Sequence, residues 1–217
     1  MTRENILAHQ RALNAAGFGR LKEDGAWGPM TASATERAVA AGRVRIVGAD
    51  KAEDLPWMQI ARSVLGLHES RDNAALRQWL RSDGATLGDP AILPWCGDFV
   101  ETCIKLALPD ERFPGPLGQN RYWARNWIYF GEPTQATYGA IAVFGRVGGG
   151  HVGFVVGDDE TGNFAILGGN QSNAVTITRI AKNRLLEGGL RWPETWPPQP
   201  IRLPRVAASG PISINEA

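Results

Sequence analysis

Cysteine is scarce in this chain of 217 residues, which contains only Cys96 and Cys103. The two lie seven positions apart on a segment with a helical pattern, where a rise of about 1.5 Å per residue would separate their Cα atoms by about 10 Å. A disulfide needs Cα atoms within about 7 Å of each other, so these cysteines cannot bridge within an intact helix. We expect two free thiols.

The chain also has no large excess of charge of either sign. It contains 23 Lys and Arg residues and 22 Asp and Glu residues, which gives a net charge of +1. A protein that grips a phosphate backbone needs a basic footprint, so the balance argues against nucleic acid as a partner. No apolar run is long enough to span a bilayer, and the start MTRENILAHQ has no apolar h-region. The sequence predicts no membrane span and synthesis in the cytoplasm without a recognisable signal peptide.

The chain is otherwise of ordinary globular composition, with 43% hydrophobic and 21% charged residues. Its length suits one full domain and one small one. Eight tryptophans are many for this length, and such side chains fill cores or form flat platforms for ligands.

Residues 1–47 form a short unit in which two helical patterns flank a glycine-rich loop. It resembles the small three-helix peptidoglycan-binding domain, whose pattern is Q-x-x-L-N-x-x-G followed by D-G-x-x-G-x-x-T. The matching residues are Gln10, Leu13, Asn14, Gly17, Asp24, Gly25, Gly28 and Thr31. The resemblance implies wall binding, for which Asp24, Gly25 and Trp27 are the candidates. The alternative is that the same aspartate and glycines only shape a turn.

Residues 48–54 are polar and predict a linker into a second domain at 55–197. Helical patterns come first in this domain, and short Val- and Ile-rich runs separated by Gly, Asp and Asn follow from about residue 138. This order predicts an α+β fold in which helices pack on an antiparallel meander. The proline-rich and then small, polar stretch at 198–217 is predicted to be a surface tail.

The stretch LPWCGDFVETC places Cys96 where a helix is expected to begin, because Pro94 disfavours continuation of a preceding helix. A helix start offers unpaired N–H groups and a partial positive charge, which favour a thiolate and are expected to lower the thiol pKa. Cys96 is therefore the candidate nucleophile. Cys103 lies two turns further on among apolar residues and is predicted to be a core residue.

A cysteine nucleophile needs a base and a polar group that orients it. His151 follows three glycines at the start of a strongly β-forming run, so it can face a cleft from a strand end. Asn170, at the end of the next run, is the preferred orienting residue, since a strand that returns antiparallel brings it back beside the imidazole. Gln171 and Asn173 are weaker choices.

With these residues in place, the segment from Leu55 to Pro193 resembles the cell-wall hydrolases of the NlpC-like and CHAP superfamily. PWCGDFV, GHVGFVVG and LGGNQSNAVTI carry the resemblance. It implies a papain-like α+β domain with Cys96 as nucleophile, His151 as base and Asn170 as the orienting residue.

The resemblance also implies a peptidoglycan hydrolase that cleaves an amide bond without a cofactor or metal. We expect a monomer that acts on the wall after release or delivery. The candidates for substrate binding are Trp95, Asp98, Trp123 and Gln171. Both an N-acetylmuramoyl-L-alanine amidase and a stem-peptide endopeptidase fit, as does a phage or prophage endolysin. The other readings are a non-catalytic wall-binding or phage-structural protein and an injected antibacterial effector.

Overall fold

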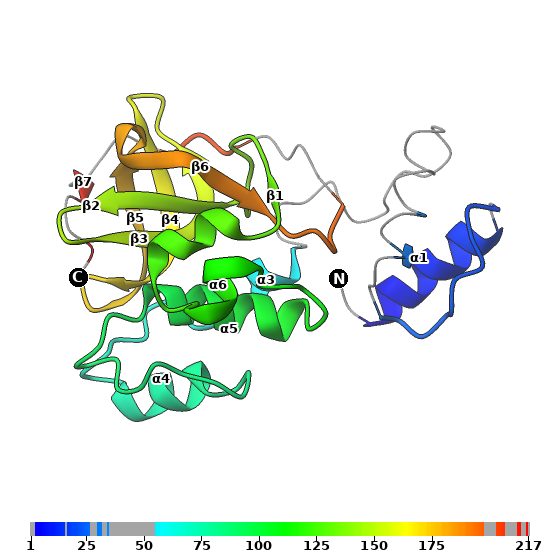
Figure 1. Ribbon diagram of the computed structural model, residues 1–217, viewed down its shortest axis with the longest axis horizontal. Helices are drawn as coiled ribbons and strands as arrows, with labels where there is room; N and C mark the ends of the chain where they lie inside the picture. The colour runs from blue at the N-terminus through cyan, green and yellow to red at the C-terminus, as the bar shows by residue number, and fades with distance from the viewer. Residues whose placement is uncertain are drawn as a thin grey trace.

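The computed structural model describes residues 3–15, 17–26, 30–31, 34, 55–197, 203–206, 212–213 and 216 (Figure 1). The predicted linker at 48–54 lies outside these residues, as do most of the second predicted helix of the N-terminal unit and most of the predicted tail. In the described ranges from residue 55 onward, helices gather on one side of a seven-stranded sheet (Figure 1). This is the α+β arrangement that the order of sequence patterns predicted.

The helical layer contains four α-helices and one longer 3-10 helix. They are α3 (Pro56–Ser63), α4 (Asn73–Leu80), α5 (Cys96–Ala107), α6 (Gly115–Gln119) and η2 (Ala124–Tyr129). Pro56 occupies the first turn of α3, where its missing N–H has no helical partner to lose. The apolar residues Trp57, Ile60, Ala61, Val64 and Leu65 have helical spacing and predict a helix that reaches Leu65. Instead α3 ends at Ser63, and the chain turns at Gly66 (φ 91°), whose N–H donates to the carbonyl of Val175 at 2.8 Å.

The sheet contains seven strands in the order β1-β6-β2-β3-β4-β5-β7. They are β1 (Glu132–Pro133), β2 (Ile141–Arg146), β3 (Gly149–Asp158), β4 (Asn163–Gln171), β5 (Ala174–Ala181), β6 (Leu185–Trp192) and β7 (Ile212–Ser213). Strands β2 to β5 fall on the Val- and Ile-rich runs GAIAVFGR, GHVGFVVGDD, NFAILGGN and AVTITRI, and successive pairs are antiparallel, which confirms the predicted meander. Strand β6 was not predicted. It follows the short 3-10 helix η3 (Lys182–Arg184) in the chain and returns across the sheet to pair with β2.

Helix α5 packs against the middle of the sheet and so fixes the position of its own first turn. Phe99 lies against Phe154 of β3, with ring centroids 6.2 Å apart, and against Trp79 of α4 at 5.5 Å. Gly169 of β4 allows a still closer approach, because a Cβ at this position would lie 2.5 Å from the Trp95 ring and 2.6 Å from Cβ of Phe99. The start of α5 is thus held directly over the end of β4.

The described part of the N-terminal unit is built around α1 (Arg3–Ala15). The helix ends in a Schellman motif: the N–H of Phe18 donates to the carbonyl of Leu13 at 3.0 Å, and that of Gly17 donates to Asn14 at 3.1 Å. Gly17 has φ 78°, a left-handed conformation that glycine adopts at little cost. Leu13 and Phe18 pack in a small apolar cluster of their own.

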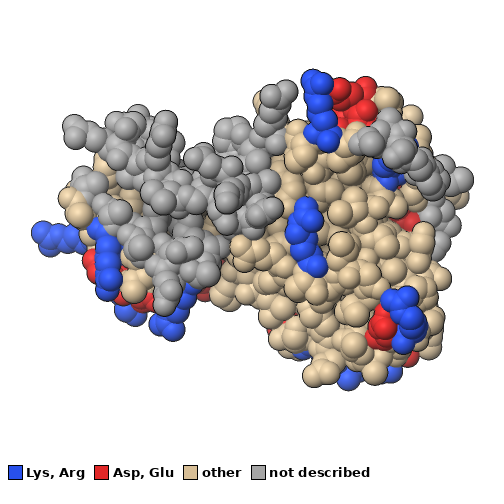
Figure 2. Space-filling view, turned by 180° about the vertical axis from the view of Figure 1, so that it is seen from behind, with Lys and Arg blue, Asp and Glu red and all other residues tan. Residues whose placement is uncertain are grey.

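Charged side chains are dispersed over the surface. Figure 2 shows the molecule from behind, with basic and acidic groups scattered among uncharged ones on the described part of this face. This distribution agrees with the near-zero net charge. None of the helices among the described residues is long and apolar enough to cross a membrane.

Candidate active site

Cys96 is the first residue of α5, as the sequence predicted. Trp95 precedes the helix in a non-helical conformation, and its carbonyl accepts the first helical hydrogen bond, from the N–H of Phe99 at 2.9 Å. The next residue, Gly97, has no room for a side chain, since a Cβ there would lie 2.5 Å from the carbonyl oxygen of Tyr122. The segment around Tyr122 therefore packs on the first turn of α5, beside the thiol.

The thiol of Cys96 is almost completely enclosed, with 4% of the residue exposed. Burial raises its pKa above the ordinary value, although the N–H of Val152 donates to the sulfur and the positive charge of Arg146 acts in the opposite direction. The prediction that the helix start lowers this pKa is therefore wrong for the resting protein, because desolvation outweighs the helix N–H groups. The contact with Val152 places the sulfur beside the start of β3.

His151 lies on β3, next in the chain to Val152, and is 1% exposed. Burial lowers the pKa of its imidazole to about 4, since a charged ring would lose its hydration. Its Nε2 lies 3.0 Å from Oε1 of Gln171. The resting pair of Cys96 and His151 is thus an uncharged thiol and an uncharged imidazole.

The orientation of Gln171 determines which imidazole nitrogen carries the hydrogen. Its Nε2 donates to the carbonyl oxygens of Thr176 at 2.6 Å and Ile166 at 3.2 Å, so its Oε1 is the atom directed at His151. An amide oxygen can only accept, so Nε2 of His151 is the protonated nitrogen. Nδ1 keeps its lone pair and is the basic nitrogen of the ring.

Asn170, the preferred orienting residue in the sequence prediction, occupies a different position. It is 6% exposed, and among the described residues no hydrogen bond joins it to His151. The register of β4 with β5 shifts between Gly168 and Gln171, and Asn170 has φ 54°. This irregularity changes the alternation of side chains, so Gln171 faces the imidazole. The structure thereby moves the orienting contact by one residue.

Two of the predicted substrate-binding residues are buried and have structural partners. Trp95 is 1% exposed, and its indole N–H donates to Oε2 of Glu69 at 2.9 Å. Asp98 is also 1% exposed, and its Oδ2 accepts hydrogen bonds from the Thr86 hydroxyl at 2.9 Å and from the N–H of Leu87 at 3.0 Å. Neither side chain is exposed in this conformation, and a role of either in substrate binding stays a prediction.

The other two predicted substrate-binding residues differ from each other. Trp123 is 47% exposed and follows the segment that packs on α5, so it is the predicted tryptophan that can meet a ligand. Gln171 is 1% exposed, and its amide is used by His151 and the sheet. The side chain of Gln171 therefore contacts the candidate base, His151.

The residues predicted to bind the wall are held by Gln10. The side chain of Gln10 donates to Oδ1 of Asp24 at 3.2 Å and to the carbonyl of Ala26 at 2.8 Å, while its Oε1 accepts from the N–H of Gly25 at 2.9 Å. Gly25 has φ 69°, so this turn requires it. These contacts fit the turn-shaping alternative, and Trp27 lies outside the described residues.

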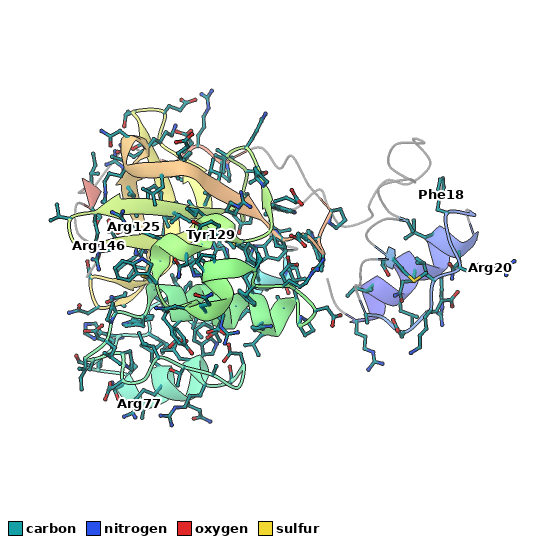
Figure 3. The ribbon with its side chains drawn as sticks, in the orientation of Figure 1. Phe18, Arg20, Arg77, Arg125, Tyr129 and Arg146 are labelled. Atoms are coloured by element: carbon teal, nitrogen blue, oxygen red, sulfur yellow. The ribbon has the colours of Figure 1, made fainter. Side chains whose placement is uncertain are left out.

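Three charged residues near the pair carried no sequence signal. Arg146 lies at the end of β2, and its carbonyl accepts from Arg125 at 3.4 Å, with the two arginines side by side in Figure 3. Arg184 and Glu216 form a buried ion pair whose charges act on His151. Neither spacing nor composition could have linked Glu216 to a histidine 65 positions earlier.

Among the described residues, no group of three or more His, Cys, Asp and Glu side chains is arranged to hold a metal ion. The amide of Gln171 contacts His151, and the N–H of Val152 and the first N–H groups of the helix face Cys96. The arrangement is chemically suited to proton transfer from a thiol to an imidazole.

The fold and site define an α+β protein with a cysteine at a helix start, a histidine on the adjoining sheet and an amide that orients the histidine. The family model of the CHAP domain matches residues 88–170, which include Cys96 and His151, so this part of the chain is similar to CHAP domains. CHAP domains are typically cysteine- and histidine-dependent amidohydrolases or peptidases of peptidoglycan. No curated protein and no solved structure matched the sequence.

Proposed function

We propose that this protein is a peptidoglycan hydrolase that cleaves an amide bond through a thioester at Cys96. The observation that carries the proposal is the arrangement around the sulfur. The N–H of Val152 donates to it, and the adjacent His151 is held through Nε2 by Gln171, which leaves Nδ1 as the base. A nucleophile, its base and an orienting group are the parts that acyl transfer by cysteine requires.

The first half of the reaction transfers the acyl group. Nδ1 of His151 takes the thiol proton as the sulfur of Cys96 attacks the amide carbonyl carbon, which gives a tetrahedral oxyanion. The backbone N–H of Cys96 at the helix start is a suitable donor to this oxyanion. His151 then passes its proton to the departing amine as the carbon–nitrogen bond breaks, and the acyl group remains on sulfur as a thioester.

The second half restores the enzyme. A water molecule gives a proton to Nδ1 and attacks the thioester carbonyl, and the carbon–sulfur bond then breaks. The product is a carboxylic acid, and the sulfur recovers its proton from the imidazolium. One amide and one water are consumed, and one amine and one acid are formed.

The uncharged resting state affects how the nucleophile is made. With a thiol pKa raised by burial and an imidazole pKa lowered to about 4, the thiolate forms mainly as the proton moves to His151. Groups that stabilise the imidazolium therefore assist the reaction, because they favour the charged pair over the neutral one.

Two alternatives remain for the bond that is cut. An N-acetylmuramoyl-L-alanine amidase and a stem-peptide endopeptidase would both use this chemistry, and an endolysin role is compatible with either. The N-terminal unit would act as a tether that raises the local concentration of the catalytic domain on an insoluble wall. The partly exposed Trp123 is the candidate to contact the substrate beside the site.

The test is digestion of purified peptidoglycan by the wild type, Cys96→Ala and Cys103→Ala, with mass spectrometry of the soluble products. Cys103 is a matched control because it is fully buried on the same helix, away from the base. We expect new amino and carboxyl ends from the wild type and from Cys103→Ala, and none from Cys96→Ala. No products from the wild type, with pelleting on the wall retained, would favour a non-catalytic wall-binding protein.

A further inference from the structure

A buried carboxylate reaches the site from a part of the chain that follows the sheet. Glu216 is 1% exposed, and its two oxygens accept from Arg184 at 2.7 and 2.9 Å, a bidentate pair. Arg184 also donates to the carbonyl of Ser213 at 2.9 Å. Burial alone would raise the pKa of Glu216, but the hydrogen bonds from Arg184 and the nearby positive groups hold it below its ordinary value, so the group is a carboxylate.

Main-chain contacts tie this pair to both strands that carry the base and its partner. The N–H of Ser172, next to Gln171, donates to the carbonyl of Glu216 at 3.1 Å. On the other side, Nε of Arg184 donates to the carbonyl of Gly145 at 3.2 Å, and Gly145 pairs with Gly150, which precedes His151. The ion pair therefore bridges the β4 end that holds Gln171 and the β2–β3 hairpin that holds the imidazole.

The charged groups that act on His151 come from three elements. Glu216 favours the protonated ring, while Arg146 of β2 and Arg184 of η3 oppose it. The hydrogen bond to Gln171 also favours the protonated ring, and Cys96 is uncharged at rest. Glu216 is thus the negative charge that most favours the protonated form of this imidazole.

From this placement we infer that Glu216, held by Arg184, is a positioning residue that stabilises the imidazolium of His151 while it carries the proton of Cys96. The inference rests on the proposed roles of Cys96 and His151 as a reactive pair. The contacts of Glu216 are with Arg184 and the N–H of Ser172. It acts through the ring of His151 and through the strand end that carries Gln171.

Substitution of Glu216 and substitution of Arg184 are expected to change the stability of the thiolate–imidazolium pair in opposite directions. This difference separates an electrostatic role of the ion pair from a structural one. Glu216→Gln removes the negative charge and leaves Arg184, so the charged pair of thiolate and imidazolium becomes less favourable. Arg184→Gln removes a positive charge that opposes the protonated ring. Because burial raises the pKa of Glu216 once Arg184 is gone, the charged pair becomes more favourable at the pH values at which Glu216 stays a carboxylate. Both variants break the same ion pair, and a merely structural contact would make them change in the same direction.

The experiment measures alkylation of Cys96 by iodoacetamide against pH, because only the thiolate displaces iodide. Mass spectrometry of the Cys96 peptide excludes any contribution from Cys103. We expect Glu216→Gln to lower the plateau rate at intermediate pH about 3- to 10-fold and to move the acid limb to lower pH, and Arg184→Gln to do the reverse. Glu160→Gln is the control, since it breaks the exposed pair with Arg205, another contact to the segment that follows β6.

The double variant Arg184→Gln with Glu216→Gln is used if a single variant fails to fold. It removes both charges of the ion pair, so neither charge is left without its partner. Its profile should lie between those of the two single variants. Shifts in the same direction for both single variants, or profiles equal to wild type, would overturn the inference. Alkylation needs no substrate, so opposite shifts together with absent peptidoglycan products would instead overturn the proposed function alone.

Discussion

Nε2 of His151 lies 3.0 Å from Oε1 of Gln171, and this contact decides which ring nitrogen is free to receive a proton. Because the Gln171 amide nitrogen is committed to the carbonyls of Thr176 and Ile166, the amide cannot turn over without losing both bonds. The tautomer of the base is therefore set by the sheet, at a distance from the sulfur.

Replacement of Gln171 should impair the base more than replacement of Asn170. We expect Gln171→Ala to lower kcat/KM on peptidoglycan fragments about 10- to 100-fold, because the ring loses its fixed orientation and tautomer. Asn170→Gly is the matched control, since glycine tolerates the φ of 54° at this position. A larger loss in Asn170→Gly than in Gln171→Ala would return the orienting role to Asn170.

The buried imidazole should make stability depend on pH. In the folded protein the pKa of His151 is about 4, whereas in the unfolded chain it is near the ordinary value of 6.5. As pH falls through this window the unfolded chain takes up the proton first, so the free energy of unfolding declines by up to about 1.4 kcal/mol per pH unit. Above the window the contribution is fully present.

Urea unfolding of the wild type and His151→Gln at several pH values measures this effect. All other titrating groups are shared, so the difference between the two curves isolates the histidine. We expect the wild-type curve to fall relative to the variant between about pH 6.5 and about pH 4. Parallel curves would mean that the imidazole is not desolvated in the folded protein.

The close approach of α5 to β4 should be sensitive to one methyl group. Gly169→Ala would place a Cβ 2.5 Å from the Trp95 ring, so we expect a cost of about 1–3 kcal/mol and lower activity as the helix start moves from His151. Gly149→Ala is the control, because a Cβ there lies no closer than 3.7 Å to its neighbour, Arg146. Equal thermal stability of the two variants would contradict the packing described here.

The turn of the N-terminal unit should depend on Gln10. Gln10→Ala removes the hydrogen bonds to Asp24, Gly25 and Ala26, and we expect reduced pelleting with purified walls at an unchanged rate of Cys96 alkylation. Arg11→Ala is the control, since its ion pair with Glu23 is exposed and contributes little. Equal pelleting of wild type and Gln10→Ala would argue that this unit does not bind the wall through its loop.

Local sequence patterns were sufficient to predict an element where the residues that determine it are close together in the sequence. Pro94 and the apolar spacing after it located the start of α5 at Cys96, and Val- and Ile-rich runs between Gly, Asp and Asn located β2 to β5. The return of β6 to pair with β2 was missed, because the paired residues lie between 41 and 50 positions apart and no local signal records the pairing. The local pattern wrongly extended α3 to Leu65, because the helix is ended by a long-range contact, the hydrogen bond from the N–H of Gly66 to Val175.

By itself, the sequence determined the α+β order of elements, the residue at the helix start and the histidine at the strand start, because each depends on the chemistry of a few neighbouring residues. The tertiary structure decided the rest of the site. A register shift in β4 selected Gln171 over Asn170, and burial reversed the expected direction of the Cys96 pKa. Glu216 came to the site through its contacts with Arg184 and Ser172, and its charge acts on His151 through space, which leaves no periodic trace in a sequence.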